Sequence, residues 1–145
     1  MAIIKWAMAK YQGLGKEGNG QVSTQSGALQ DQPYGFNTRF EDKAGTNPEE
    51  QIAAAHASCF TMALAFGLAK QGFTGGTLEC KVEISLEKEG DGFIITKSAI
   101  GLEAKVPGMN SADFEKAALE AKVNCPISKL LTCEITLDFI SFEGH

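Results

Sequence analysis

Four cysteines carry most of the potential chemistry of this 145-residue chain. They stand at positions 59, 80, 125 and 133, and no two of them have the Cys-x-x-Cys spacing. The chain has two histidines, His56 and His145. Because a zinc site needs several Cys or His ligands at short, regular spacing, we expect no metal site. In a reducing compartment the even number of cysteines does not indicate structural disulfides, so each thiol is either buried or reactive.

The local pattern separates Cys80 and Cys133 from Cys125. Cys80 and Cys133 fall on the apolar faces of alternating segments, which is typical of cysteines that act as small buried hydrophobes. Cys125 instead precedes Pro126 and occupies the N-cap position of a short helical turn. The helix dipole stabilises a thiolate there and lowers its pKa from ~8.5. Position alone leaves both a structural and a reactive role open for Cys125.

Cys59 lies twelve residues after Asn47, too deep in its expected helix for the N-terminal dipole to act on it. Burial among alanines raises the pKa of such a thiol, so it reacts only if a nearby cation stabilises the thiolate. The candidate cations are His56, one helical turn earlier, and Arg39. A packing histidine and a solvated strand arginine are the ordinary interpretations of these two residues.

The helix that carries Cys59 is expected over residues 46–72. Thr46 or Asn47 can cap its start, Pro48 suits the first helical position, and a glutamate follows at 49 or 50 to complete a capping box. Gly72 supplies a left-handed end. Since the residues between are mostly small and apolar, we expect this helix to be packed closely on several sides.

The remaining segments predict strands and one further helix. Residues 1–45 indicate a β meander, in which PYGFNTRFED is a third strand or extended loop with Phe36 and Phe40 on one face and Arg39 on the other. Residues 77–106 predict a hairpin. The face of its second strand that matches the apolar face of the first includes Ile95 and Ala99.

After the hairpin, residues 110–124 predict a helix that ends before Pro126, because a residue that precedes proline avoids the α region. The last strand alternates Cys133, Ile135, Leu137 and Phe139 with polar residues. The order βββ-α-ββ-α-β predicts one α+β domain over residues 1–145, with antiparallel sheets.

Composition excludes several classes of partner. The net charge is −5 and the sequence has no basic run, which argues against nucleic acid. We expect no membrane span, because Lys, Glu or Gln interrupts each apolar stretch before ~18 residues. The segment MAIIKWAMAK lacks the layout of a signal peptide, so we expect a cytoplasmic protein.

Two motifs carry a family resemblance. QPYGFNTRFEDKAGTNPEEQIAAAHASCF resembles the central signature of the OsmC/Ohr family, the osmotically inducible protein C and organic hydroperoxide resistance proteins. NCPISKLLTCEITLDF resembles the downstream cysteine region of the same family, and the cysteines of the two motifs are 66 residues apart. The YGFNTRF segment and the chain length favour the OsmC branch.

This resemblance implies a thiol-dependent peroxidase for organic hydroperoxides, and less well for hydrogen peroxide, with no metal or other cofactor. It makes Cys59 the peroxidatic cysteine and Cys125 the resolving one. Arg39 activates the thiolate and binds peroxide, and Glu49 positions Arg39. The fold it implies is an OsmC-like intertwined homodimer with the long helices at its centre. An external dithiol, of which a lipoyl protein is one candidate, reduces the disulfide, and osmotic or oxidative stress induces the protein.

Helix geometry adds an inference about the dimer. Ten residues separate Glu49 from Cys59, which is roughly 15 Å along a helix axis and roughly 80° around it. One helix therefore cannot readily present both groups to one site. We predict that Glu49, with Arg39, serves Cys59 of the other subunit. Phe36, Phe40 and Phe60 are candidates for an apolar wall that favours alkyl hydroperoxides.

Two other function classes stay open on the residues alone. A Cys-His hydrolase could use His56 and Cys59, which lie three residues apart, but no third orienting residue is evident. Alternatively, the chain is a non-catalytic or small-molecule-binding stress protein whose cysteines are simply buried.

Overall fold

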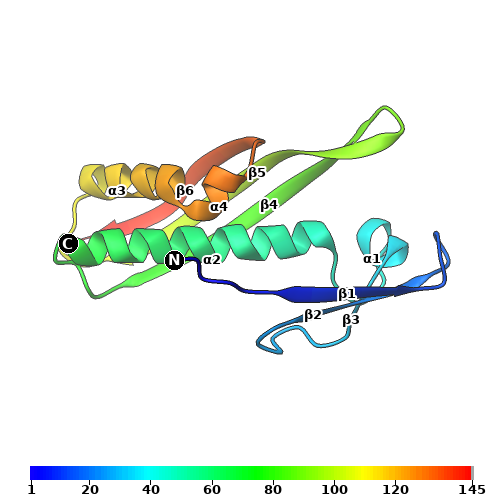
Figure 1. Ribbon diagram of the computed structural model, residues 1–145. Helices are drawn as coiled ribbons and strands as arrows, with labels where there is room; N and C mark the ends of the chain where they lie inside the picture. The colour runs from blue at the N-terminus through cyan, green and yellow to red at the C-terminus, as the bar shows by residue number, and fades with distance from the viewer. Residues whose placement is uncertain (145) are drawn as a thin grey trace. The chain divides into compact units, whose positions relative to one another are not determined.

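The computed structural model describes residues 1–144, and it divides into two compact units. The first unit comprises Met1–Gln51, and the second begins at Ile52. Figure 1 traces both units along the chain. The single domain expected over residues 1–145 stays a prediction, and each unit is described by itself.

The first unit contains a three-stranded antiparallel sheet in the order β1-β2-β3. Its strands are β1 (Ala7–Gln12), β2 (Asn19–Thr24) and β3 (Gln32–Tyr34). The predicted meander is confirmed, although its first strand begins at Ala7 rather than near Ile4.

A short helix, α1 (Phe36–Phe40), follows β3 and corrects the sequence interpretation of this segment. The third strand ends at Tyr34, and the residues after it are helical rather than extended. Phe36 and Phe40 do share a face, with ring centroids 5.0 Å apart, because residues four apart are neighbours on a helix. The spacing misled because it fits the period of a strand as well as that of a helix.

The long helix α2 (Pro48–Lys70) has the predicted ends. The Asn47 side chain accepts a hydrogen bond from the backbone N–H of Glu50 at 2.8 Å, so Asn47 is the N-cap. At the other end Gly72 has φ 95° and donates to the carbonyl of Ala69, while Phe73 donates to the carbonyl of Leu68. This pair of bonds is the Schellman motif, in which glycine is favoured.

Within the described chain, α2 buries a single stripe rather than several sides. The buried residues follow every fourth position: His56, Phe60, Leu64 and Leu68. The prediction that no stretch is long and apolar enough for a membrane span is wrong for α2, since its alanines raise the hydropathy. Only 22% of its most apolar 18-residue window is buried in the described chain. One such helix is weak evidence for a membrane, because core helices of soluble proteins share these properties.

The second unit contains a three-stranded sheet in the order β4-β5-β6. Strands β4 (Thr77–Glu89) and β5 (Gly92–Val106) form the predicted antiparallel hairpin. A bulge between Ser85 and Leu86 shifts the register, so Ile95 pairs with Leu86 but Ala99 pairs with Glu83. Because the bulge changes the parity of the strand, Ala99 lies on the outer face with Glu83, and the predicted placement of Ala99 with Ile95 is wrong.

The last strand, β6 (Glu134–Gly144), pairs parallel to β5, not antiparallel as predicted. Helices α3 (Ser111–Asn124) and α4 (Pro126–Leu130) lie between the two strands in the chain. They carry the chain back to the end where β5 began, and such a crossover permits parallel pairing. Cys133 lies just before this strand rather than within its alternation.

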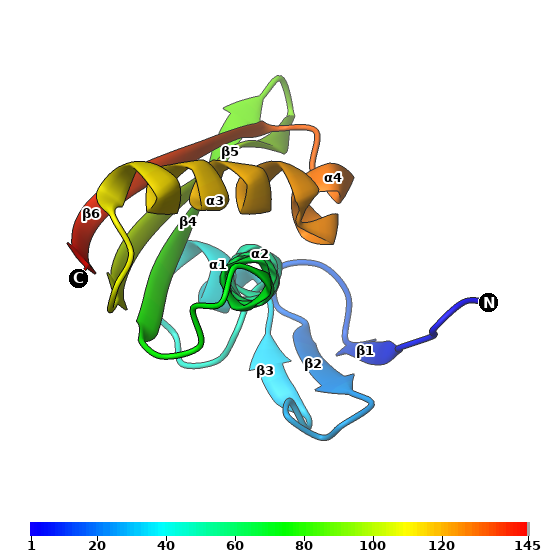
Figure 2. The same ribbon diagram turned by 90° about the vertical axis from the view of Figure 1, so that its left-hand side faces the viewer.

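Figure 2, in which α2 is seen end-on, shows α3 and α2 on the same side of the β4-β5-β6 sheet. The core of the unit lies between these layers. Alternate residues of β5 from Ser98 to Val106 point into it, and α3 contributes the predicted stripe. The fully or almost fully buried apolar side chains include Phe60, Leu64, Ile100, Leu102, Met109, Phe114, Ala118 and Cys125, and His56 and Ser98 are fully buried polar ones.

Candidate functional site

The structure brings Cys59 and Cys125 together in the second unit. Cys59 lies in the middle of α2 and is half-buried, while Cys125 is fully buried at the N-cap position of α4. The two side chains are hydrogen-bonded to each other, and both are free thiols. Cys125 is therefore buried like a core residue, but its side chain is also hydrogen-bonded to a second thiol.

The surroundings shift the pKa values of the two thiols in opposite directions. Burial raises the pKa of Cys59, and its hydrogen bond to Cys125 raises it further, against a smaller effect of the backbone N–H of Ile127. Burial also acts to raise the pKa of Cys125, but hydrogen bonds with Cys59, with Ser128 and with the backbone of Ile127 outweigh it. The net pKa of Cys125 is lowered. Within this unit Cys125 is therefore the more acidic of the two thiols, and a positive group near Cys59 would be needed to favour its thiolate.

His56 is a satisfied core histidine. It is fully buried, with Nδ1 2.6 Å from Ser98 Oγ and Nε2 2.8 Å from Ser128 Oγ. Burial lowers the pKa of His56 below its ordinary value of 6.5, so the imidazole is neutral at pH 7. A neutral ring supplies no charge for the Cys59 thiolate, which leaves His56 unsuited to the activating role considered for it.

The burial of His56 predicts a pH-dependent stability. Because its pKa is lower in the folded than in the unfolded state, the unfolded chain binds more protons as the pH falls below 6.5. The free energy of unfolding should then decrease by up to about 1.4 kcal/mol per pH unit from this group. Urea unfolding at a series of pH values measures it, and His56→Gln should show a shallower acid-side slope. Equal slopes in the two proteins would contradict the assignment.

Cys80 lies in β4 and packs partly against the core. Burial raises the pKa of its thiol to about 11. At pH 8 only about a thousandth of it is thiolate, so Cys80 should resist iodoacetamide in the folded protein. Mass spectrometry of labelled peptides tests this, with urea-unfolded protein as the labelled control. Native labelling at Cys80 would show that the strand opens or that the thiol is exposed.

Arg39 and Glu49 form the charged pair of the first unit. Arg39 Nε lies 3.0 Å from Glu49 Oε1 and 3.1 Å from Oε2, and Arg39 Nη2 also bonds Oε1. Arg39 is in the last turn of α1, and Glu49 is in the first turn of α2. Gly45, with φ 143°, precedes α2 and lets Thr46 N–H bond the carbonyl of Pro33 at 2.8 Å. The pairing fixes the guanidinium and leaves 34% of the Arg39 side chain exposed.

A hollow of about 390 Å³ opens beside Arg39. Four of its nine lining residues are aromatic, and the lining comes from β1, the turn after it, β3, α1 and the start of α2: Tyr11, Gly15, Lys16, Tyr34, Gly35, Phe36, Arg39, Phe40 and Pro48. Phe36 and Phe40, two of the candidates for an apolar wall, therefore line the hollow beside Arg39. Phe60, the third candidate, does not line it and is fully buried in the core of the second unit. Tyr11 and Tyr34 were missed, since nothing local links them to Arg39.

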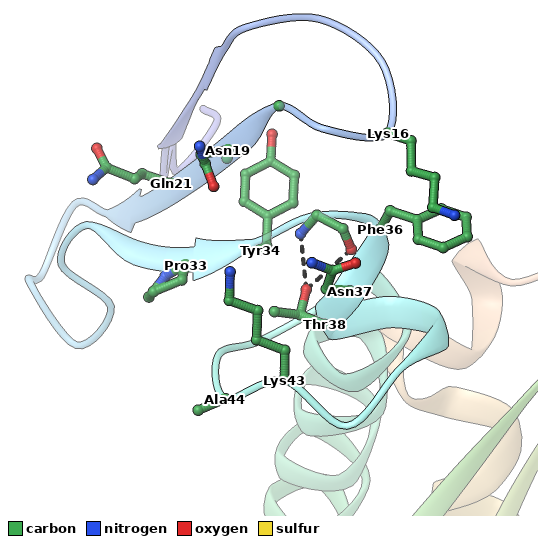
Figure 3. A pocket seen from close by; sticks show the side chains of 13 residues that line it. Lys16, Asn19, Gln21, Pro33, Tyr34, Phe36, Asn37, Thr38, Lys43 and Ala44 are labelled. Carbon is green, nitrogen blue, oxygen red and sulfur yellow. Dashed lines mark hydrogen bonds between the residues drawn. The ribbon is translucent and has the colours of Figure 1, made fainter.

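A second hollow of about 290 Å³ adjoins it and is drawn in Figure 3. Lys16 and Lys43 both line it, with Tyr34 between β2 and the helix α1. Lys16 Nζ lies 4.7 Å from the centroid of the Phe36 ring. Thr38 closes the start of α1 by accepting the N–H of Gly35 at 2.8 Å. This hollow contains no thiol or carboxylate, so we assign it no part in thiol chemistry.

The predicted site residues thus fall into two pairs, one in each unit. Within residues 1–144 no group of three or more His, Cys, Asp or Glu side chains is placed to bind a metal ion. Ser98 and Ser128, the partners of His56, were missed by sequence reasoning. Ser98 could have been noticed, because it is a polar residue in register with the apolar face of β5.

Comparisons with known proteins identify the family of this chain. The chain matches the family model described as OsmC-like protein over residues 40–139. It is 50% identical over 139 residues to the peroxiredoxin OsmC of Escherichia coli K12, covering 96% of this chain and 97% of that protein. It is 30% identical over 121 residues to the organic hydroperoxide resistance protein-like 1 of Staphylococcus saprophyticus, covering 83% of this chain and 84% of that protein.

Among solved structures, the organic hydroperoxide resistance protein OhrB of Bacillus subtilis resembles it with a TM-score of 0.66 and 25% identity. That similarity covers 97% of this chain and 98% of the other. The paired thiols, the family match over residues 40–139 and the half-identical relative lead to one conclusion: the chain belongs to the OsmC family and is a peroxiredoxin-like enzyme.

Proposed function

We propose that this enzyme reduces organic hydroperoxides to alcohols, with Cys59 as the peroxidatic and Cys125 as the resolving cysteine. The observation that carries the proposal is the direct hydrogen bond between these two thiols, which come from α2 and from the N-cap of α4. Two cysteines whose side chains are hydrogen-bonded to each other can exchange between a thiol pair and a disulfide without a large rearrangement.

The reaction has three steps. The Cys59 thiolate attacks the outer oxygen of the hydroperoxide, an S–O bond forms, the O–O bond breaks, and the alkoxide leaves as an alcohol after it takes a proton. The Cys125 thiolate then attacks the sulfur of the Cys59 sulfenic acid, which forms the S–S bond and releases water after protonation. An external dithiol reduces the disulfide by exchange, and a lipoyl protein is one candidate for it. A reducing cytoplasm would supply such a dithiol.

Arg39 supplies the positive charge that Cys59 needs. The guanidinium can lower the pKa of the thiolate and donate hydrogen bonds to the peroxide, and its pairing with Glu49 holds it in one orientation. Since Glu49 and Cys59 are ten residues apart on α2, we assign Arg39 and Glu49 to the Cys59 of a second subunit. A homodimer also explains why most of the apolar surface of α2 is uncovered in one protomer.

The aromatic hollow beside Arg39 would hold the organic group of the substrate. Phe36→Ala removes one wall of it, so KM for cumene hydroperoxide should rise about tenfold while KM for hydrogen peroxide changes by less than about twofold. Steady-state kinetics with both peroxides measures the ratio. Phe93→Ala, which removes an exposed ring from β5, is the matched control. Equal effects of Phe36→Ala on both peroxides would count against a substrate-binding role.

The direct test of the proposal is to treat the reduced protein with an organic hydroperoxide, then count thiols and map the product by mass spectrometry. A Cys59–Cys125 disulfide supports the mechanism. Four unchanged thiols in a folded sample would favour the alternative, a non-catalytic or small-molecule-binding stress protein.

A further inference from the structure

His56 takes no part in the steps proposed above, although it shares a hydrogen-bonded chain with one of the thiols. Its Nδ1 contacts Ser98 Oγ at 2.6 Å and its Nε2 contacts Ser128 Oγ at 2.8 Å. The hydroxyl of Ser128 is in turn hydrogen-bonded to Cys125. An unbroken chain therefore runs from β5 through α2 and α4 to Cys125. All four of its residues are buried.

The number of available protons sets the direction of donation along this series of hydrogen bonds. A neutral imidazole has one N–H and one bare nitrogen, and a serine hydroxyl has one proton to donate. If Ser128 donates its proton to the Cys125 sulfur, its oxygen must accept from His56, which places the imidazole proton on Nε2. Nδ1 is then bare and accepts from the Ser98 hydroxyl. In the opposite tautomer Ser128 donates to His56 and has no proton left for sulfur.

A purely structural role does not account for this arrangement. The other buried positions of the same stripe are Phe60, Leu64 and Leu68, which pack without needing any hydrogen bond. A polar ring at position 56 requires two buried hydroxyls to satisfy it, and leaving either nitrogen unpaired would be costly. The series of hydrogen bonds ends at the sulfur of Cys125, the proposed resolving cysteine.

Resting on the proposed function, we propose that His56 is a positioning residue for the resolving step. As the Nε2–H tautomer, it holds the Ser128 hydroxyl with its proton toward the Cys125 sulfur. The thiolate is thereby kept aimed at Cys59 after the first step has converted Cys59 to a sulfenic acid. His56 acts through Ser128, so it should govern disulfide formation and leave the attack on peroxide unchanged.

The balance of the resolving step explains why Cys125 needs this support. Its thiolate gives an electron pair to the sulfur of Cys59, the S–O bond breaks, and the hydroxide that leaves takes a proton from an acid in the solvent and departs as water. If the thiolate is protonated or turned away, the sulfenic acid persists and a second peroxide oxidises it to the sulfinic acid. Loss of the His56–Ser128 contact should therefore raise the yield of sulfinic acid per turnover.

The first measurement needs no peroxide. In a Cys59→Ser background, the ultraviolet absorbance of thiolate is titrated with and without Cys125→Ser, and the difference reports Cys125 alone. Ser128→Ala and His56→Leu should each raise the pKa of Cys125 by about one unit, since a hydrogen bond to a charged group is lost. His56→Gln keeps one donor and one acceptor, so the pKa of Cys125 in this variant should stay close to its wild-type value. Ser141→Ala, which removes an exposed hydroxyl from β6, is the matched control.

The second measurement follows the two chemical steps by stopped flow and mass spectrometry. Sulfenic acid formation should stay within about twofold of wild type, while disulfide formation slows about tenfold in Ser128→Ala and in His56→Leu. In the double variant the two effects should not add, because both residues act on one contact. If His56→Leu fails to fold, Ser128→Ala with and without His56→Gln gives the same comparison.

Unchanged disulfide formation in folded Ser128→Ala, or additive effects in the double variant, would overturn the inference. Failure of the proposed function looks different, because the wild type itself would then form no Cys59–Cys125 disulfide. In that case the titration in the Cys59→Ser background still decides whether His56 acts on Cys125 through Ser128.

Discussion

Cys59→Ser should abolish turnover of organic hydroperoxides, with a loss of kcat/KM of about a thousandfold or more. Serine keeps the size and the hydrogen-bonding capacity of the thiol, but its hydroxyl has no low-energy anion at neutral pH and cannot be oxidised to a sulfenic acid. The variant should fold normally, because position 59 is half-buried and a serine there can still bond Cys125. Peroxide consumption in a coupled assay, with circular dichroism for folding, measures the effect.

Cys125→Ser separates the nucleophile from the resolving group and serves as the matched control. It should still reduce about one equivalent of hydroperoxide per subunit and then stop, because the sulfenic acid at Cys59 has no partner thiol. The product of that one equivalent should be a sulfenic acid at Cys59 rather than a disulfide, and only a second equivalent would take it to the sulfinic acid. If Cys59→Ser retained activity and Cys125→Ser lost the first turnover, the two roles would have to be exchanged. The lowered pKa of Cys125 makes this a genuine alternative to exclude.

The features that could be predicted from the sequence are those determined by neighbouring residues. Asn47, Pro48 and Gly72 define the ends of α2 because caps depend on a few adjacent positions. The inner stripe of α3 was predictable for the same reason, since its spacing alone selects one face. The bulge near Leu86 was not, because the extra residue shows only when two strands are paired.

Features that depend on contacts between residues far apart in the chain could not be predicted from the sequence. Nothing in the alternation of β6 says which strand it joins, so its parallel pairing with β5 required the structure. The approach of Cys59 to Cys125 came from a family resemblance rather than from spacing. Ser128 reads as an ordinary helix residue until the fold places it between His56 and Cys125. Local reasoning therefore offered candidate reactive residues but did not predict Ser98 and Ser128, the partners of His56.

Arg39→Ala should lower kcat/KM for organic hydroperoxides by about a hundredfold or more, because the thiolate of Cys59 loses the cation that offsets its burial. Arg39→Lys should recover only part of this loss, since lysine cannot bond both carboxylate oxygens of Glu49 while it contacts the peroxide. The pH at which Cys59 ionises should rise in both variants. Thiol alkylation rates measured across pH, with peroxidase assays, give the two quantities.

Which subunit provides Arg39 can be decided with a mixed dimer. Co-expression of a Cys59→Ser chain and an Arg39→Ala chain, each with its own affinity tag, allows the heterodimer to be purified. If Arg39 acts across the interface, one of its two sites combines an intact Cys59 with an intact Arg39, and about half of the wild-type activity per dimer should return. If Arg39 acts within its own chain, every site lacks one group, and activity should not exceed that of Arg39→Ala. Because neither parent homodimer contains an intact site, any large recovery must come from two chains sharing one active site.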